Sequence, residues 1–328
     1  MKILLTLDYE LFLGRNIGTA QKCLIEPTNK LLALLDDFGV KATFFVDAGY
    51  LFHSLDMPSL HDDRSMVILQ LQVILAAGHD IQLHIHPHWE DAKEGDGEIL
   101  LPSTRYRLQQ FDTETIAKIV EKYKTILVKE FNIHPIAYRA GGWCIQPFDI
   151  LSNILYEQGI KMDSSVFPGG YLQSPGQKFD FRNAPIMDYW HFDDDPLVAQ
   201  NRGHFIELPI ASMKVSPLFY WRMVVAKLIN KQTHRSFGDG KAVESPLSNI
   251  LKLLSIPSMS VISIDGYKSK LLMKAYDTWK QKHKHMVIMG HPKAFSECSL
   301  SQLKLFLQET ITTNQFITFR DWYHEHHS

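Results

Sequence analysis

Hydrophobic positions along the chain follow two alternating periods, and this alternation predicts the order of the elements. Short apolar or β-branched runs, typical of buried strands, are separated by longer stretches with apolar residues at helical spacing. The opening run 2–7 shows the first pattern, and 27–38, which is followed by Gly39, shows the second. Further strands are expected at 41–46, 79–84, 136–139, 160–163, 205–209, 261–265, 285–289 and 316–319, and further helices at 66–77, 113–131, 148–158, 268–282 and 300–312.

The alternation of strands and helices predicts an α/β fold with a parallel sheet covered by helices. Roughly seven or eight strands in a chain of 328 residues favour a closed or nearly closed barrel over an open sheet. No GxGxxG motif follows the first predicted strand, which argues against a dinucleotide-binding fold. We predict a single domain, residues 1–328, with an insertion or lid at about 212–258 that includes a helical stretch at 219–229.

Composition and charge narrow the choice of partners and compartment. Lys and Arg total 34 and Asp and Glu total 36, so the net charge of −2 gives no reason to expect binding to nucleic acid. Three widely spaced cysteines are typical of a reducing compartment and predict neither a disulfide framework nor a zinc knuckle. No apolar run approaches the roughly 20 residues that span a bilayer, and none resembles a signal-peptide core. We therefore expect a soluble cytoplasmic protein with no membrane span.

Polar side chains gather where the predicted strands end. In a parallel barrel the functional side chains follow the carboxyl ends of the strands, so these residues should meet at one rim. Charged residues are rarely buried without partners, and their joint placement indicates a site rather than a core. The residues concerned are Asp8, Glu10, His84, His86, His88, Arg139, Asp163 and His291.

Three histidines within five residues predict a metal site, because a catalytic zinc ion typically takes three protein ligands and keeps a position open for water. If the strand continues, His84 and His86 point to the same side. If the strand instead ends before Pro87, His84 and His88 converge across a turn. Asp8 and Glu10 share one face of an extended segment, so one can complete the metal site while the other accepts a proton from water.

In this order, the motifs resemble those of the polysaccharide deacetylase family, the carbohydrate esterases of family 4 with NodB homology. The resemblance covers residues 1 to about 180 and resumes near 260. The matching segments are TLDYE at 6–10, GVKATFFV at 39–46, GHDIQLH at 78–84 with His88 four residues on, YRAGGW at 138–143 and VIMGH at 287–291.

The resemblance implies an incomplete, distorted (β/α)₇ barrel of the TIM type and a divalent metal, usually zinc. It implies that His84 and His88 bind the metal and that Asp8 is the general base. It further implies that Arg139 orients Asp8 and that His291 is the general acid.

One departure from the family pattern concerns the second acid, which the family commonly places directly after the first and uses as a metal ligand. Here that position is Tyr9, and an acid follows at Glu10. Some relatives separate the two acids by one residue, which would make Glu10 the third ligand. We also hypothesise that Asp163 holds or tunes His291.

These observations lead to the hypothesis of a metal-dependent hydrolase of C–N bonds, which removes an N-acyl group, most simply acetyl, from an amino sugar or glycan. A backbone N–H near Gly141 is a candidate for stabilising the oxyanion. His86, Gly142, Trp143 and Trp89 are candidates for contact with substrate, although core packing is the commoner role of such tryptophans. Two alternatives stay open: a hydrolase of a small non-carbohydrate amide or ureide, and a catalytically silent glycan-binding protein.

Overall fold

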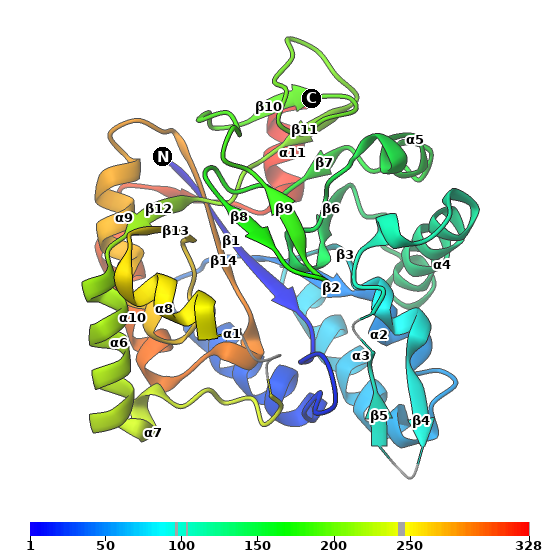
Figure 1. Ribbon diagram of the computed structural model, residues 1–328, viewed down its shortest axis with the longest axis horizontal. Coiled ribbons are helices and arrows are strands. Elements are labelled where there is room, and N and C mark those ends of the chain that lie inside the picture. Colours follow the sequence, from blue (N-terminus) through cyan, green and yellow to red (C-terminus); the bar gives the residue numbers. More distant parts are fainter. Residues whose placement is uncertain (96–97, 103, 242–246, 328) are drawn as a thin grey trace.

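The computed structural model describes residues 1–95, 98–102, 104–241 and 247–327, and a strongly curled β-sheet forms its centre (Figure 1). The strands of this sheet are β1 Lys2–Tyr9, β2 Thr43–Asp47, β3 Asp80–Ile85, β6 Ala137–Ala140, β7 Met162–Asp163, β10 Trp190–Phe192, β11 Phe205–Glu207, β14 His285–Gly290 and β15 Gln315–Phe316. They lie in the order β10-β11-β7-β6-β3-β2-β1-β14, and β15 pairs with β1.

Strand direction and the path of the sheet identify the architecture. From β14 to β11 each strand runs parallel to its neighbour, and β10 is antiparallel at the edge. Beyond β11 the chain meets the other end of the sheet, where Ile210 forms a parallel bridge with Val287, and Ser263 forms one with Met289. These isolated bridges join the segments after β11 to β14, so the two ends of the curled sheet approach each other without a regular strand pair. The prediction of a distorted (β/α) barrel is therefore confirmed.

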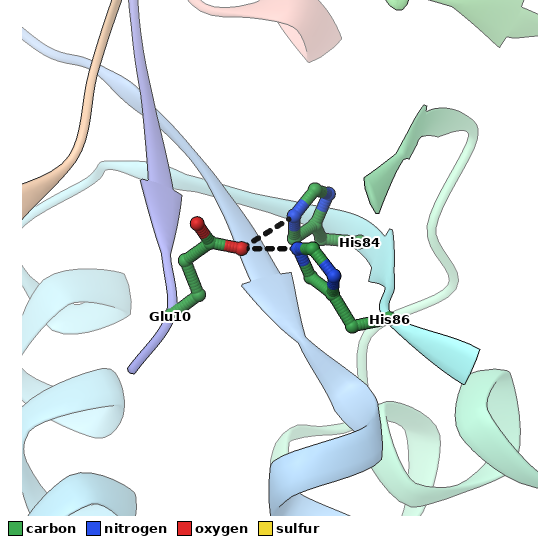
Figure 2. A group of neighbouring side chains, drawn as sticks. All are labelled: Glu10, His84 and His86. Carbon is green, nitrogen blue, oxygen red and sulfur yellow. Dashed lines mark hydrogen bonds and ion pairs between the residues drawn. The ribbon is translucent and has the colours of Figure 1, made fainter. Parts of the chain in front are cut away.

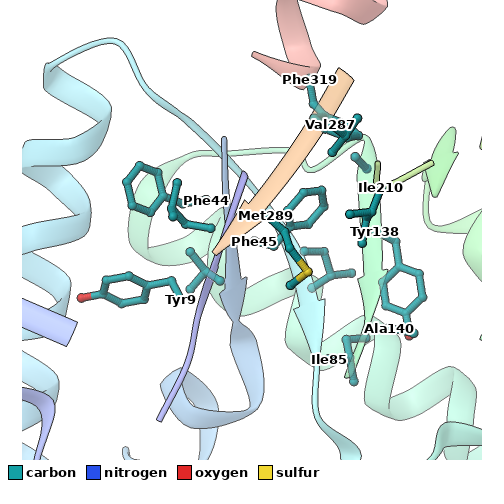
Figure 3. Close-up of a cluster of buried hydrophobic side chains, with 14 of the residues drawn as sticks. Tyr9, Phe44, Phe45, Ile85, Tyr138, Ala140, Ile210, Val287, Met289 and Phe319 are labelled. Carbon is teal, nitrogen blue, oxygen red and sulfur yellow. The ribbon is translucent and has the colours of Figure 1, made fainter. Parts of the chain in front are cut away.

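The core lies inside the barrel and between the sheet and its helices. The central strands are buried along nearly their whole length, which explains why they consist of almost continuous apolar residues. Figure 3 shows Phe44 and Phe45 from β2, Tyr138 from β6 and Met289 from β14, all of them buried. Each such side chain contributes about 1.5–3 kcal/mol through burial.

The longer helices pack around this sheet. Within the described residues, none of the helices combines the length and the apolar character that crossing a bilayer requires. The predicted start of the helix at 113–131 is confirmed, because the Asp112 side chain accepts a hydrogen bond from the backbone N–H of Thr115. The helices are α1 Glu26–Asp37, α2 Ala48–His53, α3 His61–Ala76, α4 Thr113–Phe131, α5 Asp149–Glu157, α9 Leu272–Trp279, α10 Glu297–Thr310 and α11 Phe319–His327.

Several short elements connect these parts. Two antiparallel hairpins, β4 with β5 and β8 with β9, stand outside the main sheet. Their strands are β4 Lys93–Gly95, β5 Glu98–Leu100, β8 Tyr171–Gln173 and β9 Lys178–Asp180. The short helices are the π-helix η1 Gln21–Ile25 and the 3₁₀ helices η2 Pro58–Leu60, η3 Pro87–Asp91, η4 Leu108–Gln110, η5 Gly141–Trp143, η6 Gly266–Leu271 and η7 Pro292–Ala294.

The end of the chain differs from the expected strand at 316–319. β15 stops at Phe316, and a helix begins at Phe319. The side chains of Phe319 and Trp322 on this helix are fully buried against the barrel. Burial of these two aromatic rings, which lie three positions apart and hence on one helical face, explains why the segment is helical.

The region predicted as an insertion forms what we call the helical arm, residues 212–261, of which 242–246 lie outside the described residues. Its base is an antiparallel ribbon of β12 Ser212–Val215 and β13 Ser258–Val261. Its remaining elements are α6 Pro217–Ile229, α7 Lys231–His234 and α8 Leu247–Ser255. In Figure 1 the three helices lie together along the left-hand edge of the molecule.

Candidate active site

Alternation along β1 separates its polar side chains. Tyr9 points away from the barrel interior, and its hydroxyl donates a 2.7 Å hydrogen bond to Gln70 on α3 (Figure 3). Asp8 and Glu10 lie on the other face, because side chains two positions apart in a strand share a face. The substitution of tyrosine for the family's usual second acid therefore places a core residue at position 9, and Glu10 reaches the site instead.

Glu10 meets two histidines at the carboxyl end of β3, as Figure 2 shows. Oε2 of Glu10 lies 3.0 Å from Nε2 of His84 and in close contact with Nε2 of His86. One ligand atom from each of the three residues lies within 4.8 Å of the others, and all three side chains are buried. One carboxylate and two imidazoles form a donor set of the kind that catalytic zinc ions use.

The hydrogen bonds around the two imidazoles fit a cation. Nδ1 of His84 lies 2.8 Å from the carbonyl oxygen of Arg139 and donates to it, which leaves Nε2 facing the Glu10 carboxylate. Nδ1 of His86 is buried without a hydrogen-bond partner among the described residues, and its Nε2 lies in close contact with Oε2 of Glu10. Two imidazole nitrogens and a carboxylate that converge in a buried site are the donors that a divalent ion would need.

His88 is not part of this group, although both of its buried ring nitrogens also lack a hydrogen-bond partner among the described residues. β3 continues through Ile85 and the 3₁₀ turn η3 begins only at Pro87, so His86 points to the same side as His84. The His88 ring stacks on Tyr106 at a centroid distance of 5.9 Å. Burial lowers the pKa of His88 well below its usual range, so the ring is neutral. The group contains His86, which we assigned to substrate contact, where the resemblance implied His88.

Asp8 is held by a buried arginine. Nη1 of Arg139 donates a 2.6 Å hydrogen bond to Oδ1 of Asp8, and Nε donates to the Ser164 carbonyl at 2.7 Å. The guanidinium also lies 4.1 Å from the centre of the Phe45 ring. Since a buried charge is tolerated only when paired, the contact fixes the position of the Asp8 carboxylate. The resemblance implied this contact between Arg139 and Asp8.

His291 reaches the same site from the end of β14. Its Nε2 lies 3.6 Å from Oδ2 of Asp8 and 3.7 Å from Oε1 of Glu10. On the other side of the ring, Nδ1 lies 2.7 Å from Oδ2 of Asp265, whose second oxygen accepts the backbone N–H of His291 at 2.7 Å. Burial lowers the pKa of His291, but the carboxylates of Asp265 and then Asp8 outweigh burial and raise it. The ring is thus oriented and favours its protonated form.

The hypothesis that Asp163 tunes His291 is wrong. Asp163 accepts hydrogen bonds from the backbone N–H and the hydroxyl of Ser165, both at 2.8 Å. It also stands in register with Glu207 on the neighbouring strand β11. Burial is the main cause that raises the pKa of both carboxyl groups. The partner of His291 is Asp265, the last residue of the strand expected at 261–265.

A lysine that the sequence analysis did not single out completes the site. Nζ of Lys293 donates to Oε1 of Glu10 at 2.8 Å and to the carbonyl oxygen of Leu11 at 2.7 Å. Burial raises the pKa of Glu10, but the charges of Lys293 and then His86 outweigh burial and lower it. The signal in the sequence was its position, two residues after His291, in the turn that follows a strand.

Two glycines allow the backbone to approach the site closely. A Cβ atom at Gly141 would lie 2.6 Å from Nδ1 of His86, so a larger residue would displace that ring. Gly142 has a φ of 58°, and a Cβ there would lie 2.6 Å from the Tyr106 hydroxyl. Gly141 therefore brings main chain beside the His86 ring, and Gly142 brings it beside Tyr106, at positions where a side chain would not fit.

The two tryptophans considered for sugar stacking have packing roles. Trp89 is 1% exposed, and its indole N–H donates to Oδ2 of Asp47 at 2.7 Å, so it cannot stack on a substrate as we hypothesised. Trp143 is only partly buried and packs edge-on against Phe167 and Phe179 at centroid distances of 5.3 and 5.9 Å. Of the two, Trp143 alone keeps exposed surface.

Comparison with known proteins identifies the fold. No protein-family model matches the chain, and no curated protein sequence matches it. A protein from Pseudomonas aeruginosa PAO1, described as a probable polysaccharide deacetylase, is 13% identical with a TM-score of 0.52 over 99% of this chain and 91% of that one. The allantoinase Puue is 12% identical with a TM-score of 0.50 over 98% and 88%. At these identities the likeness shows the fold alone, and the chain has the fold of the polysaccharide deacetylases that its motifs resemble.

Proposed function

We propose that the protein is a metal-dependent hydrolase that removes an N-acyl group, most simply acetyl, from an amino sugar or glycan. One observation carries the proposal: the three-residue donor set of Glu10, His84 and His86 lies beside an oriented carboxylate, Asp8, and an oriented imidazole, His291. A structural core has no need of such a combination of buried ionisable groups.

Glu10, His84 and His86 are the residues that would hold the metal. A bound divalent ion, of which zinc suits these nitrogen and oxygen donors, would lower the pKa of a water molecule towards ~7 and polarise the amide carbonyl. The hydrogen bond from His84 to the Arg139 carbonyl orients the ring before any ion arrives.

Asp8 and His291 are suited to the two proton transfers of amide hydrolysis. Asp8, held in place by Arg139, accepts the proton of the attacking water. His291, kept protonated by Asp265, gives a proton to the nitrogen of the leaving amine, which would otherwise leave as a poor anion. The two side chains lie 3.6 Å apart, so both can reach one reacting group.

The backbone at Gly141 supports a third role. Because this residue lies directly against the His86 ring, its main chain is close to where the carbonyl oxygen of a substrate would sit. We propose that a backbone N–H here stabilises the negative charge that develops on that oxygen. Gly142 and the partly exposed Trp143 extend this edge of the site and are proposed to contact the substrate.

A second candidate is the hydrolysis of a small amide or ureide. The deep burial of all three candidate ligands favours it, since a small substrate reaches an enclosed site more easily than a polymer does. The allantoinase Puue has the same fold, so ureides belong among the compounds to be tested.

The test is an assay of zinc-loaded protein on N-acetylglucosamine oligomers, measured as acetate release, with allantoin and simple amides assayed in parallel. The proposal predicts acetate release that falls by about 10²–10⁴ in kcat in the Asp8→Asn and His291→Ala variants. Glu114→Gln, at an exposed site on α4, is the matched control and should retain full activity. Hydrolysis of ureides alone would favour the second candidate. Zinc binding without any turnover would favour a silent glycan-binding protein.

A further inference from the structure

The helical arm exposes an unusual amount of apolar surface. On α6, Leu228 and Ile229 are 67% and 81% exposed, and on α8, Leu247 is 77% exposed. Large apolar side chains that are exposed together on two helices in contact indicate a site of interaction. The most informative exposed apolar residues are Leu218, Trp221, Leu228, Ile229, Leu247 and Leu251.

The fold itself does not require these side chains. α6 packs towards the barrel through a different face, on which Tyr220 joins Val215 and Leu271 in a small buried cluster. The opposite face of α6 is also apolar, although the described residues leave it open to solvent. Apolar side chains on the solvent-facing side of a helix, in addition to those on its packed side, indicate nonpolar surroundings on that side too.

The charge of the arm identifies the kind of surroundings. Exposed cations are interspersed with the apolar residues, among them Arg222, Lys227, Lys231 and Lys252. The sequences of α6, α7 and α8 contain neither Asp nor Glu, although acids outnumber Lys and Arg, 36 to 34, in the chain as a whole. The three helices of the arm therefore combine exposed apolar side chains with charges of positive sign only.

We propose that the helical arm binds the surface of a bilayer that contains anionic lipids. Tryptophan and leucine side chains that enter the interface, together with Lys and Arg that contact acidic headgroups, are the features of helices that lie on membranes. A second copy of the chain is a poorer occupant, because a symmetric contact would set the same cations against each other. A soluble protein is also a poorer occupant, because protein interfaces are depleted in lysine.

The arm is connected to the candidate active site. After α7 the chain returns to the barrel, where the backbone N–H of Gly238 donates to the carbonyl oxygen of Lys293. Asp239 accepts hydrogen bonds from the backbone N–H and hydroxyl of Thr19, in the loop that follows β1. Membrane binding would therefore hold the rim of the site near the lipid surface. This inference goes beyond the proposed function and does not depend on it.

The test is co-sedimentation of the full chain with vesicles of phosphatidylcholine alone and of phosphatidylcholine mixed with phosphatidylglycerol. We expect binding to the mixed vesicles that weakens as salt is raised. The double variant Leu228→Ser with Ile229→Ser should lower the partition coefficient by at least about tenfold. Lys227→Glu with Lys231→Glu should lower it by a similar factor.

Matched controls lie on helices outside the arm. Leu69→Ser with Val73→Ser changes two residues of α3 that are 62% and 58% exposed, and Lys129→Glu changes an exposed cation of α4. These variants should bind vesicles like the wild type, and circular dichroism would show that every variant is folded. Failure of the wild type to bind mixed vesicles would overturn the proposal, as would equal binding by the arm variants. A concentration-dependent dimer that the same arm variants abolish, without vesicle binding, would assign the surface to a second copy.

Discussion

Lys293 places its ammonium group 2.8 Å from Oε1 of Glu10, so a buried cation already holds the carboxylate that faces His84 and His86. The lysine is itself anchored by the carbonyl oxygen of Leu11. It positions Glu10, but it also repels any metal ion that the same carboxylate binds. Which effect dominates decides how tightly this site binds a metal.

Repulsion is the larger effect on physical grounds. A unit charge within several ångströms of a divalent ion opposes it by several kcal/mol at an effective dielectric constant of about 20, whereas a lost orienting hydrogen bond costs about 1 kcal/mol. The Lys293→Met variant should therefore bind zinc at least about tenfold more tightly in a chelator competition titration. Lys30→Met, at an exposed ion pair, is the control. Weaker binding by Lys293→Met would mean that positioning Glu10 matters more than charge.

Asp265 should control the pH range of activity through His291. Burial lowers the pKa of His291, and Asp265 is the main group that raises it. A general acid works only while it is protonated, so activity is retained below the pKa of His291 and lost as the pH rises through it. In Asp265→Asn that pKa falls, and the basic limb of the kcat profile should move to lower pH.

The measurement is kcat as a function of pH for wild type, Asp265→Asn and the exposed control Asp277→Asn. A basic limb that stays in place in Asp265→Asn would exclude His291 as the acid that Asp265 supports. A uniform loss of activity at all pH values would point to a purely structural role for Asp265.

The buried carboxyl pair of Glu207 and Asp163 should make stability depend on pH. Burial, and then the Asp163 charge, raise the pKa of Glu207 well above its usual range. A carboxyl group with a raised pKa in the folded state stabilises the fold fully below its unfolded pKa of about 4.3, and this contribution is lost as the pH rises towards the folded value. The free energy of unfolding should therefore decline from mildly acidic to neutral pH.

Glu207→Gln tests this point, because the amide resembles the protonated acid and cannot ionise. Urea unfolding at several pH values should show a shallower decline with rising pH in the variant than in the wild type. If the free energy of unfolding changed with pH in the same way in both proteins, the pKa of Glu207 would not differ between the folded and unfolded states.

Much of the site followed from the sequence because parallel strands end at one rim. That rule places Asp8, Glu10, His84, Arg139 and His291 together, and the structure brings all five into contact. The alternation of strands and helices predicted the barrel for the same reason, since each regular element carries its own period.

The choice between His86 and His88 could not be made from spacing. The choice depends on whether the backbone stays extended through position 86 before η3 begins at Pro87. The local sequence is compatible with an extended backbone and with an earlier turn. Asp265 and Lys293 were missed for a related reason. They follow segments that join the sheet by isolated bridges or short turns, where long-range packing rather than local pattern sets the side-chain position.

In the helical arm and the C-terminal helix, too, long-range packing sets structure that the local sequence pattern does not predict. We predicted an insertion or lid at about 212–258, but the residues there show no period that would reveal the ribbon of β12 and β13. At the C-terminus, burial of Trp322 against the barrel favours a helix where the local residues favoured a strand.

The metal content of protein purified without chelators tests the central claim most directly, in wild type, His86→Ala and His88→Ala measured side by side. Elemental analysis should find about one equivalent of zinc or another divalent metal in the wild type and in His88→Ala, and a loss of most of it in His86→Ala. Retention of metal by His86→Ala together with its loss from His88→Ala, or a wild type that takes up no metal even when metal is added, would contradict the account.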